Sequence, residues 1–255
     1  MRQTVGVFLE KLIKQSILNS THSVLCICAW EAEILLFKKL GINNVVSSNI
    51  AATEPAKAVA RKGYEYQYES FDAMNLPYED ESYDFVFVSD GLHHCSVPHK
   101  ALAEMYRVCK KGIIVCEACD NILIRLAIKY NLIEEYEVSA IVPETQSGGI
   151  NNSVIPNYVY RWTEREFIKI INSCYPYGKN TFKFDYYLNY PKSYQQNKLL
   201  YWPLCLVSFV FKKLRNSFYM VAIKPDVPSG LWKWICFNNG KFGFVETDYK
   251  IRDYS

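Results

Sequence analysis

Short apolar runs alternate with segments of helical periodicity along the first half of the chain. Helical spacing of apolar residues predicts helices over 5–18, 31–40, 56–62 and 99–109, and β-branched or aromatic runs predict strands over 23–28, 44–48, 64–68, 83–89 and 113–117. A turn at 110–112 is expected before the last of these strands. Strands and helices that alternate in this way form βαβ units. The pattern therefore predicts an α/β fold with a doubly wound parallel sheet covered on both faces.

The alternation loosens after residue 120. This part is expected to contain helices over 121–135 and 163–173 and strands over 182–188 and 218–223, which bring the predicted sheet to seven strands. The second helix begins with a capping box, Thr163 and Glu166. We expect residues 1–225 to form one domain with an inserted lid over about 120–160, and residues 226–255 to form a C-terminal appendage packed on it.

The composition is that of an ordinary globular protein. Of the 255 residues, 50% are hydrophobic and 22% are charged, which excludes a disordered chain and leaves enough apolar surface for a sizeable core. The net charge of +3 is spread along the chain, with no long run of basic residues. No nucleic acid partner is predicted, because such partners require a basic patch or stripe.

The cysteines number nine, which is odd, and the N-terminal segment lacks the apolar stretch and cleavage site of a signal peptide. These features predict a cytoplasmic protein whose thiols pack as small apolar groups. Only Cys116 and Cys119 have the close spacing of metal ligands, and no second pair accompanies them. No metal site is therefore predicted.

The longest apolar run covers residues 199–211 and contains Pro203. It is shorter than the roughly 20 apolar residues that span a bilayer, so no transmembrane segment is predicted. Two interpretations remain for it. It is either a buried helix or an interfacial element with an aromatic body and lysine ends, which would give the protein a peripheral membrane contact.

Ligands bind outside the carboxyl ends of the strands in a parallel sheet, so the segments that follow the predicted strands matter most. One of them reads DAMNLPYEDESYD over 72–84, and DGLHH follows the fourth strand at 90–94. A further segment, ALAEMYRVCKKG, precedes the fifth strand. This order of motifs resembles the class I S-adenosylmethionine-dependent methyltransferases (methyltransferase type 11-like) over about residues 20–175. The resemblance implies a Rossmann-like seven-stranded sheet and S-adenosyl-L-methionine as the cofactor.

The resemblance also implies where the cofactor binds. The family has a glycine motif in the first strand-to-helix turn, where this chain reads CICAWEA over 26–32. Three glycines are thus replaced, although glycine lets backbone approach a ligand closely. Asp72 matches the residue that meets the adenine amino group, and Asn49 stands where an acid usually binds the ribose. The implied cofactor-binding residues are Cys28, Trp30, Asn49, Asp72, Ala73, Met74 and Ser89.

His93 and His94 are the candidate catalytic residues, because methyl transfer to oxygen or nitrogen requires removal of a proton and an imidazole suits that task. Glu117 and Asp120 are expected to cap the next helix or to face the substrate. The aromatic segment 158–162, which includes Arg161, suits a small polar acceptor such as a sugar or glycan hydroxyl, although packing of an amphipathic loop explains it too.

Two functions from different classes remain open. The first is an S-adenosylmethionine-dependent methyltransferase that acts on a small polar acceptor, and the retained Asp72 and the two histidines favour it. The second is a pseudoenzyme that keeps the fold as a binding or scaffold protein and has lost cofactor binding. The missing glycines and the two missing acids, replaced by Cys26 and Asn49, favour that alternative.

Overall fold

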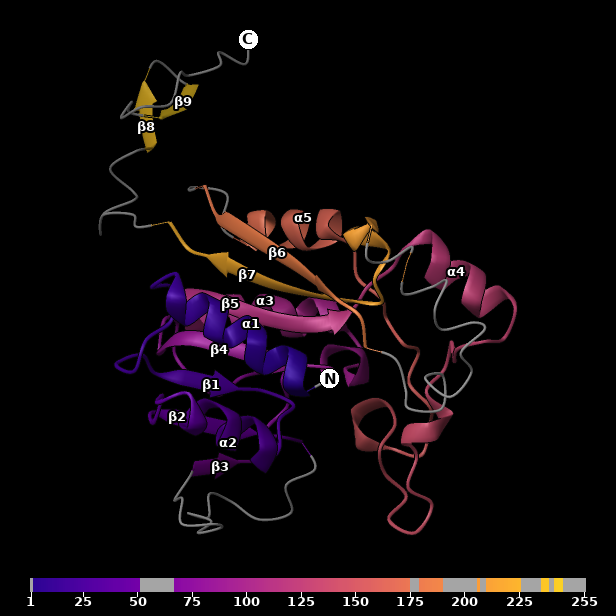
Figure 1. Ribbon diagram of the computed structural model, residues 1–255. Coiled ribbons are helices and arrows are strands. Elements are labelled where there is room, and N and C mark those ends of the chain that lie inside the picture. The colour runs from indigo at the N-terminus through magenta and orange to yellow at the C-terminus, as the bar shows by residue number, and fades with distance from the viewer. Residues whose placement is uncertain are drawn as a thin grey trace.

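The protein is built around one seven-stranded sheet (Figure 1). This computed structural model describes residues 2–50, 67–174, 179–189, 206 and 210–225, and the backbone of 235–238 and 241–244. The sheet has the order β3-β2-β1-β4-β5-β7-β6. Its strands are β1 (Val24–Cys26), β2 (Val45–Ser48), β3 (Gln67–Glu69), β4 (Tyr83–Ser89), β5 (Cys109–Ala118), β6 (Thr181–Tyr187) and β7 (Ser217–Ile223). A separate antiparallel pair comprises β8 (Ile235–Asn238) and β9 (Lys241–Phe244).

The first five strands run parallel, as the sequence predicts. β7 is antiparallel to both of its neighbours, β5 and β6. The chain reverses between β1 and β4, because β2 and β3 lie on one side of β1 while β4 and β5 lie on the other. Such a reversal opens a crevice at the carboxyl ends of the strands, which is where a doubly wound sheet binds its ligand.

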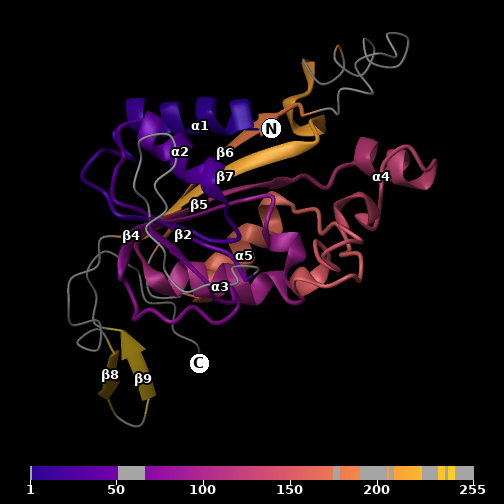
Figure 2. The ribbon, with the colours of Figure 1, turned by 90° about the horizontal axis from the view of Figure 1, so that it is seen from below.

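Helices cover both faces of the sheet (Figure 2). They are α1 (Arg2–Lys14) and α2 (Glu31–Lys39) on one face, α3 (Pro98–Val108) and α5 (Glu164–Cys174) on the other, and α4 (Ile122–Lys129) beyond the end of β5. Each face has its own apolar core: Phe8 and Phe37 belong to the first, and Met105 and Phe167 to the second. Full burial of one such side chain contributes about 1.5–3 kcal/mol. The two-sided α/β fold is therefore confirmed.

The start of β5 differs from the prediction. The expected turn at 110–112 is wrong, because β5 begins at Cys109 and continues through these residues. Gly112 pairs with Ile223 of β7, and a Cβ there would lie 2.4 Å from the backbone oxygen of Ala222. The glycine therefore permits close strand approach and does not mark a turn.

The segment 120–160 leaves the sheet after β5 and lies beyond the carboxyl ends of the parallel strands (Figure 1). It contains α4, which is shorter than predicted, and two single turns, η2 (Val138–Ala140) and η3 (Ile150–Asn152). Its placement suits the lid that the sequence predicts. The expected helix at 56–62, most of the run 199–211 and most of the appendage at 226–255 lie outside the described residues.

No helix among the residues that the structure describes is long and apolar enough to cross a membrane. Seven cysteines of this part of the chain are free thiols, and five of them are buried. Burial raises the pKa of Cys26 and of Cys116 well above the usual thiol range. The expected packing of thiols as apolar groups therefore holds for these side chains.

Candidate active site

The loops that follow β1, β2, β3 and β4 meet at one edge of the sheet. The amide of Ala29, after β1, donates to the Ser48 carbonyl of β2 at 2.8 Å, and the Asn49 amide donates to Glu69 of β3 at 3.2 Å. The loop after β4 touches the loop after β1, because a Cβ on Gly91 would lie only 2.5 Å from Cys28 Cβ. The predicted cofactor residues on these loops thus share one region.

Cys28 keeps a backbone conformation that glycine usually provides. Its φ is +50°, which lies in the left-handed region, so the turn after β1 is retained although the glycine is absent. A hydrogen bond with Cys95, together with burial, raises the pKa of the Cys28 thiol well above its usual range. The thiol is therefore a neutral part of the wall and not a nucleophile.

Trp30 does not fill the turn with its indole ring. The side chain is 54% exposed, and its ring stacks on Tyr68 of β3 with 6.3 Å between centroids. Its amide, at the start of α2, donates to Glu33 at 2.9 Å, so Glu33 caps the helix. The indole ring therefore packs on the β3 side of the turn and is largely exposed to solvent.

Asp72 shapes the loop after β3. Its Oδ1 accepts a 2.8 Å hydrogen bond from the Met74 amide, which is an Asx turn. Ala73 and Met74 are buried against the core, so they form an apolar wall next to this carboxylate. Ser89, at the end of β4, donates to the Asp90 carboxylate at 3.3 Å. The cofactor role of each residue stays a prediction.

His93 is anchored to the sheet by a buried carboxylate. Both histidines lie on η1 (Leu92–His94), the single turn after β4. Glu117, near the end of β5, is fully buried and accepts hydrogen bonds from the amides of Gly91 and Leu92 at 2.9 and 2.8 Å. Its other oxygen lies 2.9 Å from His93 Nδ1. Glu117 thus fixes both the turn and the ring.

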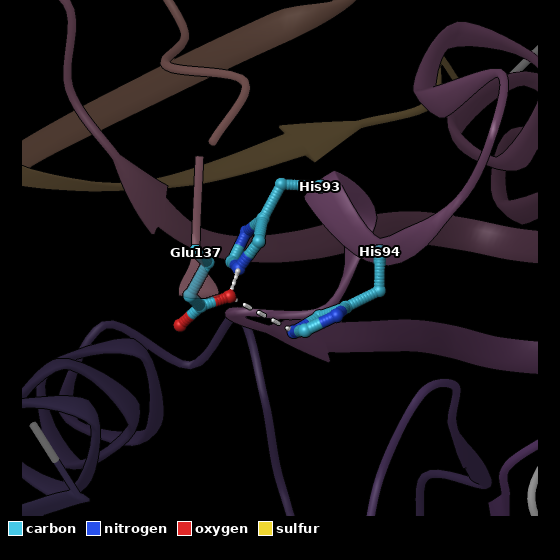
Figure 3. Close-up of side chains that lie close together, drawn as sticks. All are labelled: His93, His94 and Glu137. Carbon is cyan, nitrogen blue, oxygen red and sulfur yellow. Dashed lines mark ion pairs between the residues drawn. The ribbon is translucent and has the colours of Figure 1, made fainter. Parts of the chain in front are cut away.

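Glu137 completes this cluster from the lid (Figure 3). Its Oε2 lies 3.4 Å from His93 Nε2 and 3.5 Å from His94 Nε2. Asn157, which is fully buried, donates to the same oxygen at 3.2 Å. Sequence reasoning missed Glu137, because it lies in an irregular segment far along the chain from the histidines and belongs to no motif.

The charges of the cluster depend on burial and on these neighbours. Burial by itself lowers the pKa of His93, but the carboxylates of Glu117 and Glu137 outweigh it and raise the value to about 10. Burial and the charge of His93 lower the pKa of His94. Burial and the charge of Glu117 raise the pKa of Asp90 to about 7. His93 is therefore an imidazolium in this state, and His94 is neutral at pH 7.

Glu117 and Asp120 do not cap the next helix, so the capping alternative is wrong. Asn121 caps α4 and accepts from the amides of Leu123 and Ile124 at 3.0 and 3.1 Å. Asp120 instead pairs with Arg125 at 2.6 Å. Glu117 instead points toward η1, because it lies within β5, where side chains alternate between the two faces of the sheet.

The aromatic segment of the lid serves mainly in packing. Trp162 is fully buried and stacks on Phe167 of α5 with 4.5 Å between ring centroids. The Tyr160 hydroxyl donates to Glu166 at 2.8 Å, and Arg161 bonds to the backbone oxygens of Val159 and Glu134. The packing interpretation accounts for these contacts without an acceptor.

Comparison with known proteins gives the same family as the motifs. Residues 27–116 match the protein family described as "Methyltransferase domain". The demethylmenaquinone methyltransferase of Clavibacter sepedonicus is 29% identical over 97 residues, which is 37% of this chain and 40% of that protein. The enzyme of the same name from Streptomyces griseus is 34% identical over 91 residues, 35% of this chain and 37% of that protein. The chain thus spans less than half the length of these relatives.

Solved structures share the whole fold at low identity. The YcgJ protein of Bacillus subtilis superposes with a TM-score of 0.53 at 14% identity, covering 86% of this chain and 98% of that one. Magnesium protoporphyrin IX methyltransferase from Synechocystis PCC 6803, with bound SAH, gives a TM-score of 0.52 at 15% identity, covering 88% of this chain and 83% of that one.

The fold is of the class I methyltransferase type. Residues 27–116 match the methyltransferase domain family, and the match covers the loop after β1, the strands β2 to β4 and most of β5. The family and the fold support S-adenosylmethionine as the cofactor. The fit agrees with the left-handed turn at Cys28 and the outward position of Trp30.

Proposed function

We propose that this chain transfers the methyl group of S-adenosylmethionine to a small-molecule acceptor held beside His93 and His94. The observation that carries the proposal is that the loops after β1 to β4 converge within the segment that matches the methyltransferase family. The nucleoside end of the cofactor would lie along Asp72, Ala73 and Met74, and the turn at Cys28 would approach its methionine end.

The two histidines act on the acceptor in this proposal. They lie after β4, next to the loop that follows β1, so a methyl group bound there and an acceptor beneath the lid would meet near η1. The enzyme's task in such a displacement is to bring the acceptor atom in line with the sulfonium and to remove its proton. His93 is already protonated in this state. The proton of the acceptor must therefore pass to His94, unless His93 first loses its own extra proton.

The acceptor chemistry has two candidates. A sugar or glycan hydroxyl follows from the aromatic lid segment, but its side chains are engaged in packing. The relatives named as demethylmenaquinone methyltransferases suggest an acceptor with an apolar, ring-bearing body. Ile122 and Leu126 of α4, within the lid, are exposed by 58% and 42%, which favours the apolar body over the sugar.

We also propose a peripheral membrane contact on this side. Leu206, Val210 and Phe211, the described residues of the apolar run 199–211, are all exposed. Lys212 and Lys213 follow them in η4 (Lys212–Leu214), which contacts α4. Apolar side chains beside lysines suit an anionic membrane surface. Sedimentation with anionic vesicles should carry the protein down, and equal sedimentation with neutral vesicles would contradict the charge argument.

Calorimetry with S-adenosylmethionine and its demethylated product tests the cofactor step. Micromolar binding, on the order of 8 kcal/mol, is expected for the enzyme, whereas no heat at millimolar ligand would favour the pseudoenzyme. Asp72→Ala should abolish binding. The matched control is Asp72→Asn, which keeps an acceptor for the Met74 amide and so separates loss of the turn from loss of the carboxylate.

Methyl transfer itself is tested with isotopically labelled cofactor and two acceptor sets, a demethylated quinone and a series of simple sugars. Label in the quinone product is expected. Label in a sugar alone would replace the quinone by the glycan acceptor, and cofactor binding without any transfer would leave a binding protein.

A further inference from the structure

Three ligand-type atoms converge between η1 and the lid. One ring nitrogen of His93, one of His94 and a carboxylate oxygen of Glu137 all lie within 4.8 Å of one another. Both imidazole nitrogens approach the same oxygen, at 3.4 and 3.5 Å (Figure 3). These contacts are longer than ordinary hydrogen bonds, and both rings face the same carboxylate oxygen as ion-pair partners.

The remaining polar atoms of the three side chains are held by other groups. Glu117 lies 2.9 Å from Nδ1 of His93, and the backbone carbonyl of Gly149 accepts a hydrogen bond from the His94 ring. Asn157 donates to Glu137 at 3.2 Å. A carboxylate behind a ligating histidine is the usual outer partner in metal sites, because it orients the ring and increases its basicity.

We propose that His93, His94 and Glu137 bind a divalent transition-metal ion of the zinc type. Zinc bonds to histidine and carboxylate of about 2.0–2.1 Å place tetrahedral ligands roughly 3.3 Å apart, which matches the two measured separations. Two imidazoles exclude the hard cations Ca²⁺ and Mg²⁺, which take oxygen ligands. Three protein ligands leave one position open, as in catalytic zinc sites.

The open position gives the metal a role in the proposed methyl transfer, and this part of the inference rests on that function. An acceptor hydroxyl that coordinates the ion releases its proton to water more readily. The deprotonated hydroxyl, or the ring carbon that it makes electron-rich, would then form the bond to the methyl carbon while the carbon–sulfur bond breaks and its electron pair stays on sulfur as a neutral thioether. A methylated ring carbon would lose its proton to water. The histidines would thus serve the acceptor as ligands and not as bases.

Metal binding is tested on the full chain after removal of bound metal with a chelator. Titration with Zn²⁺ against a chromophoric chelator gives the affinity, and Co²⁺ gives a visible spectrum that reports coordination geometry. One equivalent of metal and a tetrahedral Co²⁺ spectrum are expected. Glu137→Gln and His94→Ala should each weaken binding by more than the roughly 10–100-fold that follows loss of an outer-shell partner.

Glu135→Gln is the matched control, because Glu135 is an exposed carboxylate of the same lid segment, and it should bind metal as the parent does. Equal affinity in Glu137→Gln and Glu135→Gln, or no stoichiometric binding by the parent protein, would overturn the metal site and leave an ion-paired cluster. Thermal unfolding of each variant detects loss of fold, and if His94→Ala does not fold, Glu137→Gln decides. Calorimetry with S-adenosylmethionine on the same samples reports the cofactor site independently.

Discussion

Gly91 and Cys28 are expected to be coupled, because the cysteine occupies the space that a side chain at residue 91 would need. A Cβ on Gly91 would lie 2.5 Å from Cys28 Cβ and 3.0 Å from Val88 Cγ2. Non-bonded carbons normally stay about 3.5–4.0 Å apart. Gly91 has a φ of −125°, which alanine also adopts, so the cost of Gly91→Ala is steric. Overpacking of this kind lowers the free energy of unfolding by about 1–3 kcal/mol.

The double variant Cys28→Gly with Gly91→Ala should recover part of that loss. Removal of the Cys28 side chain eliminates the 2.5 Å contact and the 3.4 Å contact with its sulfur, and the 3.0 Å contact with Val88 Cγ2 remains. It also replaces a non-glycine residue at a φ of +50°, which relieves about 1–2 kcal/mol of left-handed strain. We expect Gly91→Ala to cost at least about 1 kcal/mol less in the Cys28→Gly background than in the parent.

Urea unfolding of the parent, the two single variants and the double variant measures this coupling. Gly6→Ala on α1 serves as control, since its new Cβ would lie at an ordinary 3.4 Å from Leu36 Cδ1 and alanine favours the helix. Effects that add within about 0.3–0.5 kcal/mol would refute the reasoning, as would a Gly91→Ala variant as stable as the parent. The cofactor turn would then be looser than these contacts indicate.

Three further predictions concern the cofactor edge and the framework. Trp30→Gly should change S-adenosylmethionine affinity in calorimetry: weaker binding means that the indole stacks on the ligand, and unchanged binding would remove Trp30 from the site. Thr163→Ala breaks the capping box of α5 and should lower the free energy of unfolding by about 0.5–2 kcal/mol, whereas an unchanged urea midpoint would contradict the cap. Asp84→Asn tests pH dependence. Burial opposes its charge, but the Ser23 amide and Lys111 outweigh burial and hold the pKa of Asp84 below its usual range. The carboxylate therefore stabilises the fold above the usual aspartate pKa, and this stability is lost as pH falls through the lowered value. The free energies of unfolding of the parent and the variant should differ at pH 7 and converge in acid. A difference that does not change with pH would show that the charge of Asp84 does not stabilise the fold.

The framework could be predicted because each element depends on a local pattern. The parallel strands and the helices that cover them follow from apolar periodicity alone, and the capping box at Thr163 fixes the start of α5. The prediction of a turn at 110–112 is wrong, because the local pattern of two lysines and a glycine is typical of a turn. Only pairing with β7, which is remote in sequence, shows that Gly112 lies within a strand.

The candidate site could be predicted only in part, for the same reason. Its histidines are adjacent in sequence and belong to a recognisable string after β4. The sequence predicts that Glu117 caps a helix or faces the substrate, but the apolar pattern of its strand does not indicate that its carboxylate anchors His93. Glu137 reaches the cluster through the fold of the lid, and no spacing rule links it to the histidines. Contacts that form only through tertiary structure leave no periodic signal.

The buried carboxylate of Glu117 makes the position of His93 independent of the lid. Because Glu117 connects η1 to β5, the sheet determines the position of the His93 imidazole. The position of Glu137 instead depends on the lid segment 120–160. Exchange of the segment 120–160 for another of similar length would therefore replace Glu137 and change the surface that contacts the acceptor. The His93 ring would keep its position. The segment between β5 and α5 is therefore a suitable place to graft foreign sequence in chimeras.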